Sequence, residues 1–310
     1  MTQKKTVVVT GGNGFLGKHL VKKFKDKGYT VGVPLHETFD LRRREQVRNM
    51  YASFLPDIVV HAAAVCGGIQ ACSANPGKFL YDNLVMGLEM MEGAREYGLE
   101  KFVQIGSVCS YPLNVELPAW EGDLWEGYPE ITNAPYGIAK RVLIELAQTY
   151  RNQYAMDTIG LIPVNMYGPG DSFDPDRSHA IPSLIRKCIE AKNSGEKLWV
   201  WGTGVATREY IYVEDCADAI VMATEAYNSS CPVNVGTGVE ISTRRLVSTI
   251  VEAIGFTGEI VWDATKPEGQ PRRWFDVSWA EKSFGFKAKV GLEEGIKNTV
   301  EWYKRTHVQA

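Results

Sequence analysis

The sequence lacks the marks of several common classes of protein. Its six cysteines form no Cys-x-x-Cys pair and follow no regular spacing, so neither a zinc site nor a disulfide framework is expected. No apolar run approaches the length that crosses a bilayer, and the N-terminal Met-Thr-Gln-Lys-Lys leads into a short strand without the apolar segment of a signal peptide. We therefore expect a cytoplasmic protein that binds neither a metal ion nor a membrane.

The chain also lacks a charge imbalance, an internal repeat and a low-complexity tract. Its 34 basic and 37 acidic residues are mixed along the 310 positions, and the formal net charge is −3. This balance offers no basic surface for nucleic acid. With 45% hydrophobic and 23% charged residues, the composition is that of a globular protein with a sizeable core.

Short β-branched runs alternate with amphipathic helical segments in the first half of the chain. This alternation predicts a parallel sheet covered by helices on both faces. After about Pro163 the alternation is less regular. We therefore expect the α/β class, with a Rossmann-type, doubly wound parallel sheet in residues 1–165 and a smaller C-terminal α/β domain in residues 166–310, some of whose segments return to the first domain. The predicted strands are residues 6–10, 30–33, 57–61, 101–105, 158–162 and 198–201, and the predicted helices are residues 18–27, 79–97, 136–154, 181–192, 242–254 and 292–304.

A glycine-rich turn follows the first predicted strand. Gly11, Gly14 and Gly17 have the spacing that lets a chain turn tightly, approach a pyrophosphate and pack a helix against a strand. The N–H groups at the start of that helix would face the phosphates. A glycine-rich turn that binds nothing is the less favoured reading, because a strand precedes the turn and a helix follows it. The sequence therefore predicts a dinucleotide site.

The end of the second predicted strand bears on the choice between NAD and NADP. An acidic residue at this place would bind a ribose 2′-hydroxyl. Val33 and Pro34 are uncharged, and His36 could lie near a 2′-phosphate, whereas Glu37 leaves the other cofactor open. We expect NADP(H), with NAD(H) as the alternative.

Tyr136 and Lys140 are four residues apart in a predicted helix, so they lie on the same face. A lysine beside a tyrosine favours the phenolate and lowers the pKa of the phenol, which would then exchange protons near neutral pH. Ser107 lies upstream, between the glycine turn and this pair.

The glycine turn, Ser107 and Tyr136-x-x-x-Lys140 together resemble the extended short-chain dehydrogenase/reductase superfamily, whose members mostly act on nucleotide sugars. Several other blocks are similar to the GDP-L-fucose synthase family, and they extend the resemblance over nearly the whole chain. These blocks are residues 106–112, 132–136, 165–169, 178–182, 201–204, 208–209 and 266–269.

The resemblance implies a bifunctional NADPH-dependent enzyme that epimerises C3 and C5 of GDP-4-keto-6-deoxy-D-mannose and reduces C4 to give GDP-L-fucose. Ser107 would hydrogen-bond the C4 oxygen, Tyr136 would exchange its proton, and Lys140 would lower the tyrosine pKa and hold the nicotinamide ribose. Inverting C3 and C5 requires acid/base groups on both faces of the ring. In the family, the residues matching Cys109 and His179 have this role, and both side-chain types can titrate near neutral pH in a perturbing site.

The resemblance also implies a homodimer and a set of binding residues. The helices at residues 79–97 and 136–154 would pair with those of a second copy. The GDP-sugar would contact Asn165, Lys187, Trp201, Arg208 and Asp276, and the cations among them suit a diphosphate. The cofactor would contact Gly11, Gly12, Asn13, Gly14, Phe15, Leu16, Gly17, His36, Asp40, Leu41, Ala62, Ala63, Ile105, Gly106, Ser107, Tyr136, Lys140, Pro163, Asn165, Met166 and His179.

Some positions depart from the family's pattern. Asn13 and His36 stand where many relatives carry arginines, of which the one matching Asn13 helps to bind the 2′-phosphate. Val108 and Ser110 replace the usual residues around Cys109. Lys187 replaces an arginine and loses its bidentate geometry at a phosphate.

Other interpretations compete with this one. A buried cysteine after a strand is commonly a packing residue, and a histidine in a loop is commonly exposed to solvent without a function. Cys109 and His179 could therefore each have no catalytic role. A reductase of a related GDP-4-keto sugar, a deoxyhexose or a heptose, would need neither of them. A catalytically silent cofactor-binding sensor would be free to lose Tyr136 or Lys140, yet both are present.

Overall fold

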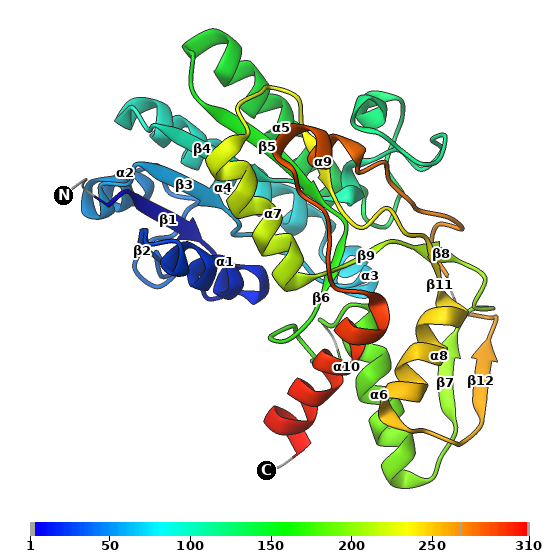
Figure 1. Cartoon of the computed structure of the whole chain (residues 1–310). Helices are drawn as coiled ribbons and strands as arrows, with labels where there is room; N and C mark the ends of the chain where they lie inside the picture. Colours follow the sequence, from blue (N-terminus) through cyan, green and yellow to red (C-terminus); the bar gives the residue numbers. More distant parts are fainter. Residues whose placement is uncertain (1–3, 176, 267, 309–310) are drawn as a thin grey trace.

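The computed structural model describes residues 4–175, 177–266 and 268–308. A six-stranded sheet lies at its centre, in the order β10-β5-β4-β3-β1-β2, and all its pairs are parallel (Figure 1). Parallel neighbours need crossover connections, which the intervening helices supply. The strands are β1 (Thr6–Thr10), β2 (Thr30–Gly32), β3 (Ile58–His61), β4 (Lys101–Ile105), β5 (Thr158–Pro163) and β10 (Val233–Val235).

Helices cover both faces of this sheet, because apolar side chains of β1 point to both faces. Val7 and Val9 join the core cluster that includes α1 and α7, whereas Val8 joins the cluster that includes α2 and α4. Because successive side chains of a strand point to opposite faces, each face buries its own apolar layer. The covering helices are α1 (Phe15–Asp26) and α7 (Val213–Ala226) on one face, and α2 (Arg44–Phe54), α4 (Pro76–Tyr97) and α5 (Ala134–Tyr154) on the other.

The C-terminal part forms a second, smaller core below the sheet in Figure 1. Its helices are α6 (Ala180–Ser194), α8 (Thr243–Ile254) and α10 (Leu292–Tyr303), packed against the parallel pair β7 (Leu198–Trp201) and β12 (Ile260–Asp263). The Ser242 side chain caps α8 by accepting the N–H of Arg245, and Gly255 ends it with a φ of 69°.

Shorter elements connect these parts. Strand β6 (Asn165–Tyr167) pairs in parallel with β9 (Tyr210–Tyr212). Strand β8 (Thr207–Arg208) pairs in antiparallel with β11 (Ile241–Ser242). The remaining elements are α3 (Ile69–Ala74), α9 (Ser278–Phe284), η1 (Val108–Ser110), η2 (Glu121–Trp125) and η3 (Lys304–Val308).

The structure confirms the predicted fold class and every predicted strand of the first half to within one residue. It also shows what the sequence pattern did not reveal. Helices α2 and α7 and strand β10 were not predicted, and β10 extends the central sheet beyond β5 although it lies in the C-terminal half of the chain. The boundary at residue 165 stays a prediction.

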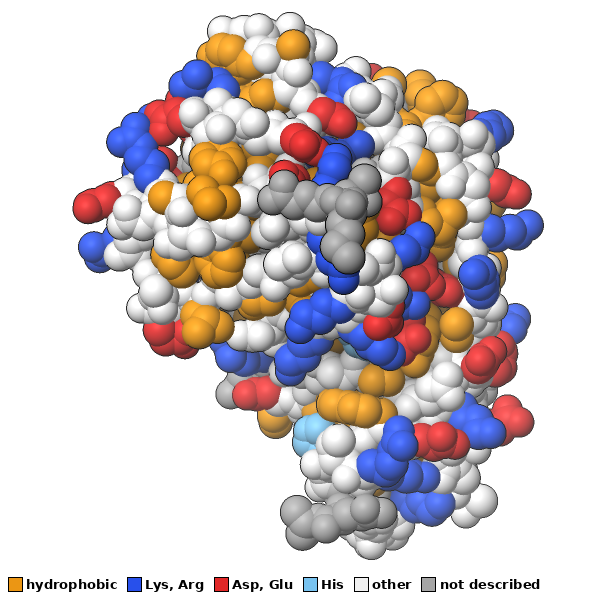
Figure 2. Space-filling model, turned by 60° about the vertical axis from the view of Figure 1, so that its left-hand side comes forward, with side chains coloured by type: hydrophobic (Ala, Val, Ile, Leu, Met, Phe, Trp, Pro, Cys, Tyr) orange, Lys and Arg blue, Asp and Glu red, His pale blue; other side chains and the backbone are white. Residues whose placement is uncertain are grey.

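The described residues also show whether a helix could span a membrane and how charge is distributed on one face. Within the described residues, no helix is both long and apolar enough to cross a membrane. On the face drawn in Figure 2, basic side chains gather across the middle of the molecule with acidic side chains close beside them. The cytoplasmic location stays a prediction.

Candidate active site

The glycine turn between β1 and α1 has the shape of a phosphate cradle. Gly11 has a φ of 69°, and its carbonyl accepts the N–H of Gly14 at 2.9 Å. A Cβ on Gly17 would lie 2.0 Å from the Gly11 oxygen, so only glycine lets α1 begin this close to the turn. No side chain caps α1 at Gly14, so the first N–H groups of the helix remain for an anion. The residues present therefore fit a dinucleotide pyrophosphate.

The ends of β2 and β3 border this turn. A Cβ on Gly12 would meet the Val33 side chain at 2.8 Å, and one on Gly11 would meet the Ala63 Cα at 2.8 Å. The Ala63 N–H donates to Thr10 Oγ1 at 3.2 Å, and this hydroxyl lies 2.9 Å from Nδ1 of His61. Burial, with a contribution from Lys140, lowers the pKa of His61 to about 3, so its imidazole stays neutral. Among the predicted cofactor residues, Ala62 and Ala63 thus lie beside the turn.

Other predicted cofactor residues, in the glycine turn and in the segment after β2, differ in their exposure. Leu41 is buried, and Asn13 and His36 are exposed. Arg42 donates to both carboxylate oxygens of Asp40, from Nε at 2.9 Å and from NH2 at 2.8 Å. This pairing holds the pKa of Asp40 well below its usual range. Asp40 is therefore engaged in an ion pair within the protein.

Ser107, Tyr136 and Lys140 meet where β4 ends against the start of α5. Lys140 is 2% exposed, its Nζ donates to the Ile105 carbonyl at 3.0 Å, and it lies 5.8 Å from the Tyr136 ring centroid. Ser107 Oγ accepts the N–H of Cys109 at 3.2 Å, which begins the η1 turn. The sequence predicted that these three residues act together, and in the structure they lie close to one another.

The direction of the tyrosine pKa differs from the prediction. Burial raises the pKa of Tyr136 well above its ordinary value, and the nearby thiols of Cys66 and Cys109 raise it further. Burial also lowers the pKa of Lys140 to about 8. The net direction is therefore opposite to the expected one, because desolvation disfavours the phenolate. Tyr136 stays protonated at neutral pH.

Gly137 brings Cys109 next to this pair. A Cβ on Gly137 would lie 2.1 Å from the Cys109 carbonyl oxygen, so α5 packs directly on the η1 turn. Two arginines hold the same turn: Arg141 Nε donates to the Ser110 carbonyl at 2.8 Å, and Arg273 donates to the Val108 carbonyl. The sequence analysis named neither arginine, since a donor to a backbone carbonyl leaves no motif.

His179 approaches from a different part of the chain. It is exposed at the N-terminus of α6, yet enough protein surrounds it that partial desolvation lowers the pKa of its imidazole. A Cβ on Gly68 would lie 3.0 Å from the Ser178 carbonyl, so the loop after β3 abuts the His179 loop. Cys66 lies in that loop, within electrostatic range of both Lys140 and Cys109. The Cys66 loop thus connects the His179 segment with the Tyr136 segment.

Three of the predicted substrate residues, Lys187, Trp201 and Arg208, lie on α6, β7 and β8. Lys187 Nζ lies 5.4 Å from the Trp201 ring centroid. Arg208 donates from NH1 to the Gln270 carbonyl at 2.6 Å and from NH2 to the Glu268 carbonyl at 3.0 Å. Glu268 in turn accepts the Thr203 N–H through Oε1. Glu268 therefore contacts both the loop that follows Trp201 and the side chain of Arg208.

Asp276 contacts other residues. Its Oδ1 accepts the Ser278 N–H at 2.8 Å at the start of α9. It also lines a cavity of about 270 Å³ together with Thr237 and Trp274. Asp276 thus contacts the first residue of α9, whereas Glu268, which was not predicted, lies at Arg208. The signal was present in the block at residues 266–269.

Further predicted residues lie at the ends of the sheet strands. The Gly106 N–H donates to the Leu161 carbonyl at 2.7 Å, and Pro163 is the last residue of β5. Asn165 Nδ2 donates to the Glu209 carbonyl at 2.9 Å, which ties β6 to β9, and Met166 follows it in β6. These residues lie at the carboxyl edge of the sheet, where ligands bind in open α/β folds.

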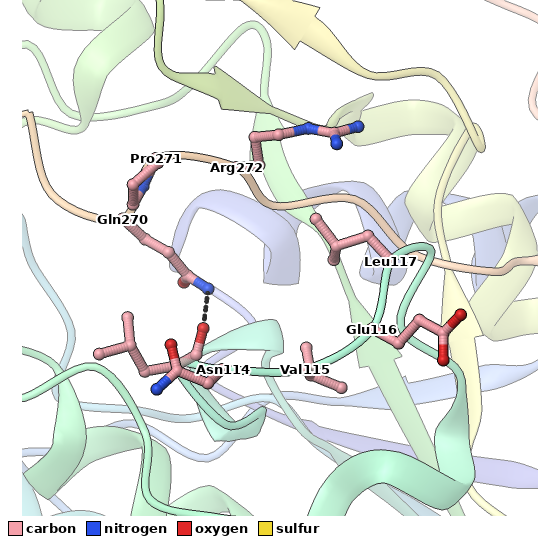
Figure 3. Close-up of a pocket in the computed structure, with 8 residues that line it drawn as sticks. Asn114, Val115, Glu116, Leu117, Gln270, Pro271 and Arg272 are labelled. Atoms are coloured by element: carbon pink, nitrogen blue, oxygen red, sulfur yellow. Dashed lines mark hydrogen bonds between the residues drawn. The ribbon is translucent and has the colours of Figure 1, made fainter.

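A cavity of about 610 Å³ lies between the segments at residues 113–117 and 270–272 (Figure 3). Gln270 crosses it, donating from Nε2 to the Leu113 carbonyl at 2.7 Å. The Gln270 carbonyl also accepts a hydrogen bond from Arg208, so one residue that lines this cavity contacts a predicted substrate residue.

Known proteins are similar to this chain over nearly its whole length. The family model described as NAD dependent epimerase/dehydratase matches residues 7–236. GDP-L-fucose synthase 1 of Arabidopsis thaliana is 38% identical over 299 residues, covering 96% of this chain and 92% of that protein. A GDP-6-OMe-4-keto-L-xylo-heptose reductase from C. jejuni has a similar structure, with a TM-score of 0.92 and 26% identity over 99% of each chain. A GDP-L-fucose synthetase from Naegleria fowleri, solved bound to NADP, has a TM-score of 0.91 and 27% identity, covering 100% of this chain and 97% of that one.

Proposed function

The chain belongs to the NAD dependent epimerase/dehydratase family as a GDP-L-fucose synthase-like member, and from this premise we propose that it converts GDP-4-keto-6-deoxy-D-mannose to GDP-L-fucose. The conversion combines epimerisation at C3 and C5 with reduction at C4, and NADPH is the proposed hydride donor. The observation that carries the proposal is the contact of Gly137 with the Cys109 carbonyl, because it sets a thiol beside the Tyr136 and Lys140 pair. A plain reductase needs no such thiol.

The proton transfers of epimerisation fit the states of the side chains. A neutral imidazole can accept a proton from a carbon next to the keto group, and partial desolvation keeps the pKa of His179 below its ordinary value. Cys109 would act on the other face of the ring. The negative charge that develops on the C4 oxygen would receive hydrogen bonds from Ser107 and Tyr136. We assign the acid/base work at C3 and C5 to Cys109 and His179.

Reduction at C4 uses the same oxygen. The cofactor, held at the glycine turn, supplies the hydride when bound. Tyr136 keeps its proton because burial raises the pKa of its phenol, and it would donate that proton to the C4 oxygen as the alcohol forms. Lys140, fixed on the Ile105 carbonyl, would orient the nicotinamide ribose and resupply the proton.

The remaining assignments follow from the same proposal. Residues 1–165 would mainly bind the cofactor and residues 166–310 mainly the GDP-sugar. Contacts with the GDP-sugar would come from Asn165, Lys187, Trp201, Arg208 and Asp276, with Lys187 and Arg208 suited to its diphosphate. We also propose a homodimer through α4 and α5, supported by apolar side chains exposed on these helices, among them Tyr81 at 64% and Leu88 at 37%. Light scattering would test the dimer by comparing the molecular mass in solution of the Leu88→Glu variant with that of the unaltered protein. We expect a monomer for the variant and a dimer for the unaltered protein.

A direct assay tests the activity. The protein is incubated with GDP-4-keto-6-deoxy-D-mannose and NADPH or NADH, cofactor oxidation is followed, and the product is identified by NMR. GDP-L-fucose is the expected product. A product that keeps the D-manno configuration would contradict the proposed epimerase activity and would still be consistent with the reductase activity.

One observation favours a second candidate. The cavity beside Arg208, of about 610 Å³, could hold a substituent larger than the methyl group of a 6-deoxy sugar. A C4 reductase of a related GDP-4-keto sugar, such as a heptose, would use this space. The same assay with a GDP-4-keto-heptose separates the two candidates through the ratio of their kcat/KM values.

A further inference from the structure

An aromatic cluster joins the chain between β6 and α6 to helix α10. Phe173, in that chain, is 6% exposed, and its ring stacks on Tyr303 with the ring centroids 4.2 Å apart and the planes at 28°. Tyr303 is the last residue of α10, and His307 follows in η3. The His307 ring lies 4.6 Å from the Tyr303 ring and 5.7 Å from the Phe173 ring. These three residues, the α10 cluster, anchor Phe173 to the smaller core.

The backbone continues from the α10 cluster to His179 through one hydrogen bond. Asp174 follows Phe173 directly, and its carbonyl accepts the N–H of Ser178 at 2.8 Å. Ser178 precedes His179, the residue at which α6 begins. The anchored ring of Phe173 is therefore tied to the residue next to His179.

Helix α10 also holds the beginning of the same connection. Tyr167, the last residue of β6, is 2% exposed. A Cβ on Gly295 of α10 would lie 2.2 Å from the Tyr167 hydroxyl oxygen, so the helix packs directly on this side chain. The chain that leads to His179 is thus fixed to α10 at two places, Tyr167 and Phe173.

The His179 side chain depends on this backbone for its place. It is exposed, and it does not cap α6. Its neighbour Ser178 is held by the Asp174 carbonyl and by the close approach of Gly68. Because buried aromatic rings pack in few orientations, the α10 cluster limits how far this backbone can move.

We propose that Phe173 and Tyr303 are positioning residues, whose ring contact sets the place of the His179 imidazole at the sugar through the hydrogen bond between Ser178 and Asp174. The inference rests on the proposed function, in which His179 transfers protons at C3 and C5. Tyr136 and Lys140 belong to α5 and do not depend on this contact. Loss of the ring contact should therefore slow the proton transfers and spare the C4 step.

Two substitutions at Tyr303 separate the ring from its hydroxyl. Tyr303→Leu removes the ring and should slow deuterium incorporation from D₂O at C3 and C5 by about 10- to 100-fold, because small misplacements of reacting groups are costly. Tyr303→Phe keeps the ring and should retain the rate. Phe173→Leu removes the partner ring and should give the same loss as Tyr303→Leu. Val247→Ala in α8 takes apolar volume from the same core without removing a ring, and it controls for a general loss of stability.

The C4 step is measured alone in the reverse direction. Oxidation of GDP-L-fucose at C4 is read as the first-turnover reduction of NADP⁺ or NAD⁺, and it precedes any proton removal at C3 or C5. This rate should stay within about threefold in Tyr303→Leu and Phe173→Leu.

Amide hydrogen exchange tests the positioning without a sugar. The N–H of Ser178 should exchange at least about tenfold faster in Tyr303→Leu than in Tyr303→Phe, because its acceptor is no longer anchored. Unaltered Ser178 exchange, unaltered deuterium incorporation, or equal slowing of the C4 step would each overturn the positioning role. Absence of deuterium incorporation by the unaltered protein would instead contradict the proposed function, and the positioning role would fail with it.

Discussion

Tyr136 and Lys140 lie on a long helix packed against the central sheet, whereas His179 lies in an exposed position at the start of α6. Lys140 is fixed by the Ile105 carbonyl, and Cys109 sits on a turn that two arginines and Gly137 hold in place. His179 is positioned through the contact of Ser178 with Gly68. The wall of the site formed by the sheet and α5 is thus rigid, and the wall formed by the loops depends on neighbouring loops. The rigid wall suits proton delivery to one oxygen, whereas the loop wall can approach the ring from its other face.

The largest expected effect is on the rigid wall. Tyr136→Phe removes the proton donor and should lower the rate of C4 reduction by about 10⁴-fold, because the C4 oxygen loses its general acid and keeps only the hydrogen bond of Ser107. Stopped-flow measurement of NADPH or NADH oxidation gives this rate. Tyr128→Phe, which removes a hydroxyl from a 63% exposed tyrosine, is the matched control and should retain the rate. Comparable reduction by Tyr136→Phe would show that Tyr136 is not the donor.

The next effect separates the two walls. Cys109→Ser and His179→Gln should each slow proton exchange at C3 and C5 by about 10²- to 10³-fold, since each removes one acid/base group. Deuterium incorporation from D₂O, followed by NMR, measures this exchange. Cys231→Ser is the thiol control, because Cys231 is exposed just before β10. Unaltered exchange in Cys109→Ser would refute its assigned role.

A packing variant tests how the rigid wall is held. A Cβ on Gly137 would lie 2.1 Å from the Cys109 carbonyl, so Gly137→Ala should displace the turn and cost about 1–3 kcal/mol of stability. Both reactions should slow by about 10- to 100-fold, because small misplacements of reacting groups are costly.

Gly77→Ala in α4 is its control. No atom lies within 4 Å of a Cβ built at that position, so this change should raise stability by about 0.4–1 kcal/mol. Urea unfolding compares the two variants. Equal stability of both variants would show that the close contact at Gly137 is not required.

The smallest expected effect is on the pH dependence of the protein's stability, through a histidine beneath the rigid wall. His61 lies buried beneath it, with its pKa lowered to about 3. In the unfolded chain, a histidine binds a proton below a pH of about 6.5. The unfolded state therefore binds more protons between these values, and stability falls as pH falls through that window.

A variant without the His61 imidazole isolates this contribution. Between a pH of about 7.5 and about 5.5, His61 alone should account for a loss of about 1.4 kcal/mol. Urea unfolding of His61→Asn at both values should show a smaller loss than the unaltered chain. An equal loss in both proteins would mean that His61 charges in the folded state.

The sequence predicted the elements whose signals are local. The strand at β1 is a run of valines before a glycine turn, and α8 has a serine cap and a closing glycine. Helix α2 was missed because it is largely polar, with Val47, Met50 and Tyr51 as its buried residues. Helix α7 was missed because its buried residues surround much of it and leave no single apolar stripe.

The site shows the same division. Ser107, Tyr136 and Lys140 could be predicted because their spacing is fixed by one strand end and one helix. Arg273 could not, since its role depends on where a distant loop returns to the η1 turn. The pKa of Tyr136 could not be predicted either, because burial depends on packing that no spacing reports.

The central claim is that one site holds both the reductase pair and the epimerase pair. It is tested most directly by incubating the unaltered protein with GDP-4-keto-6-deoxy-D-mannose in D₂O, first alone and then with NADPH or NADH, and reading the sugar by NMR. We predict deuterium at both C3 and C5 before reduction, followed by GDP-L-fucose as the product. A product of D-manno configuration without deuterium at either carbon would contradict the claim.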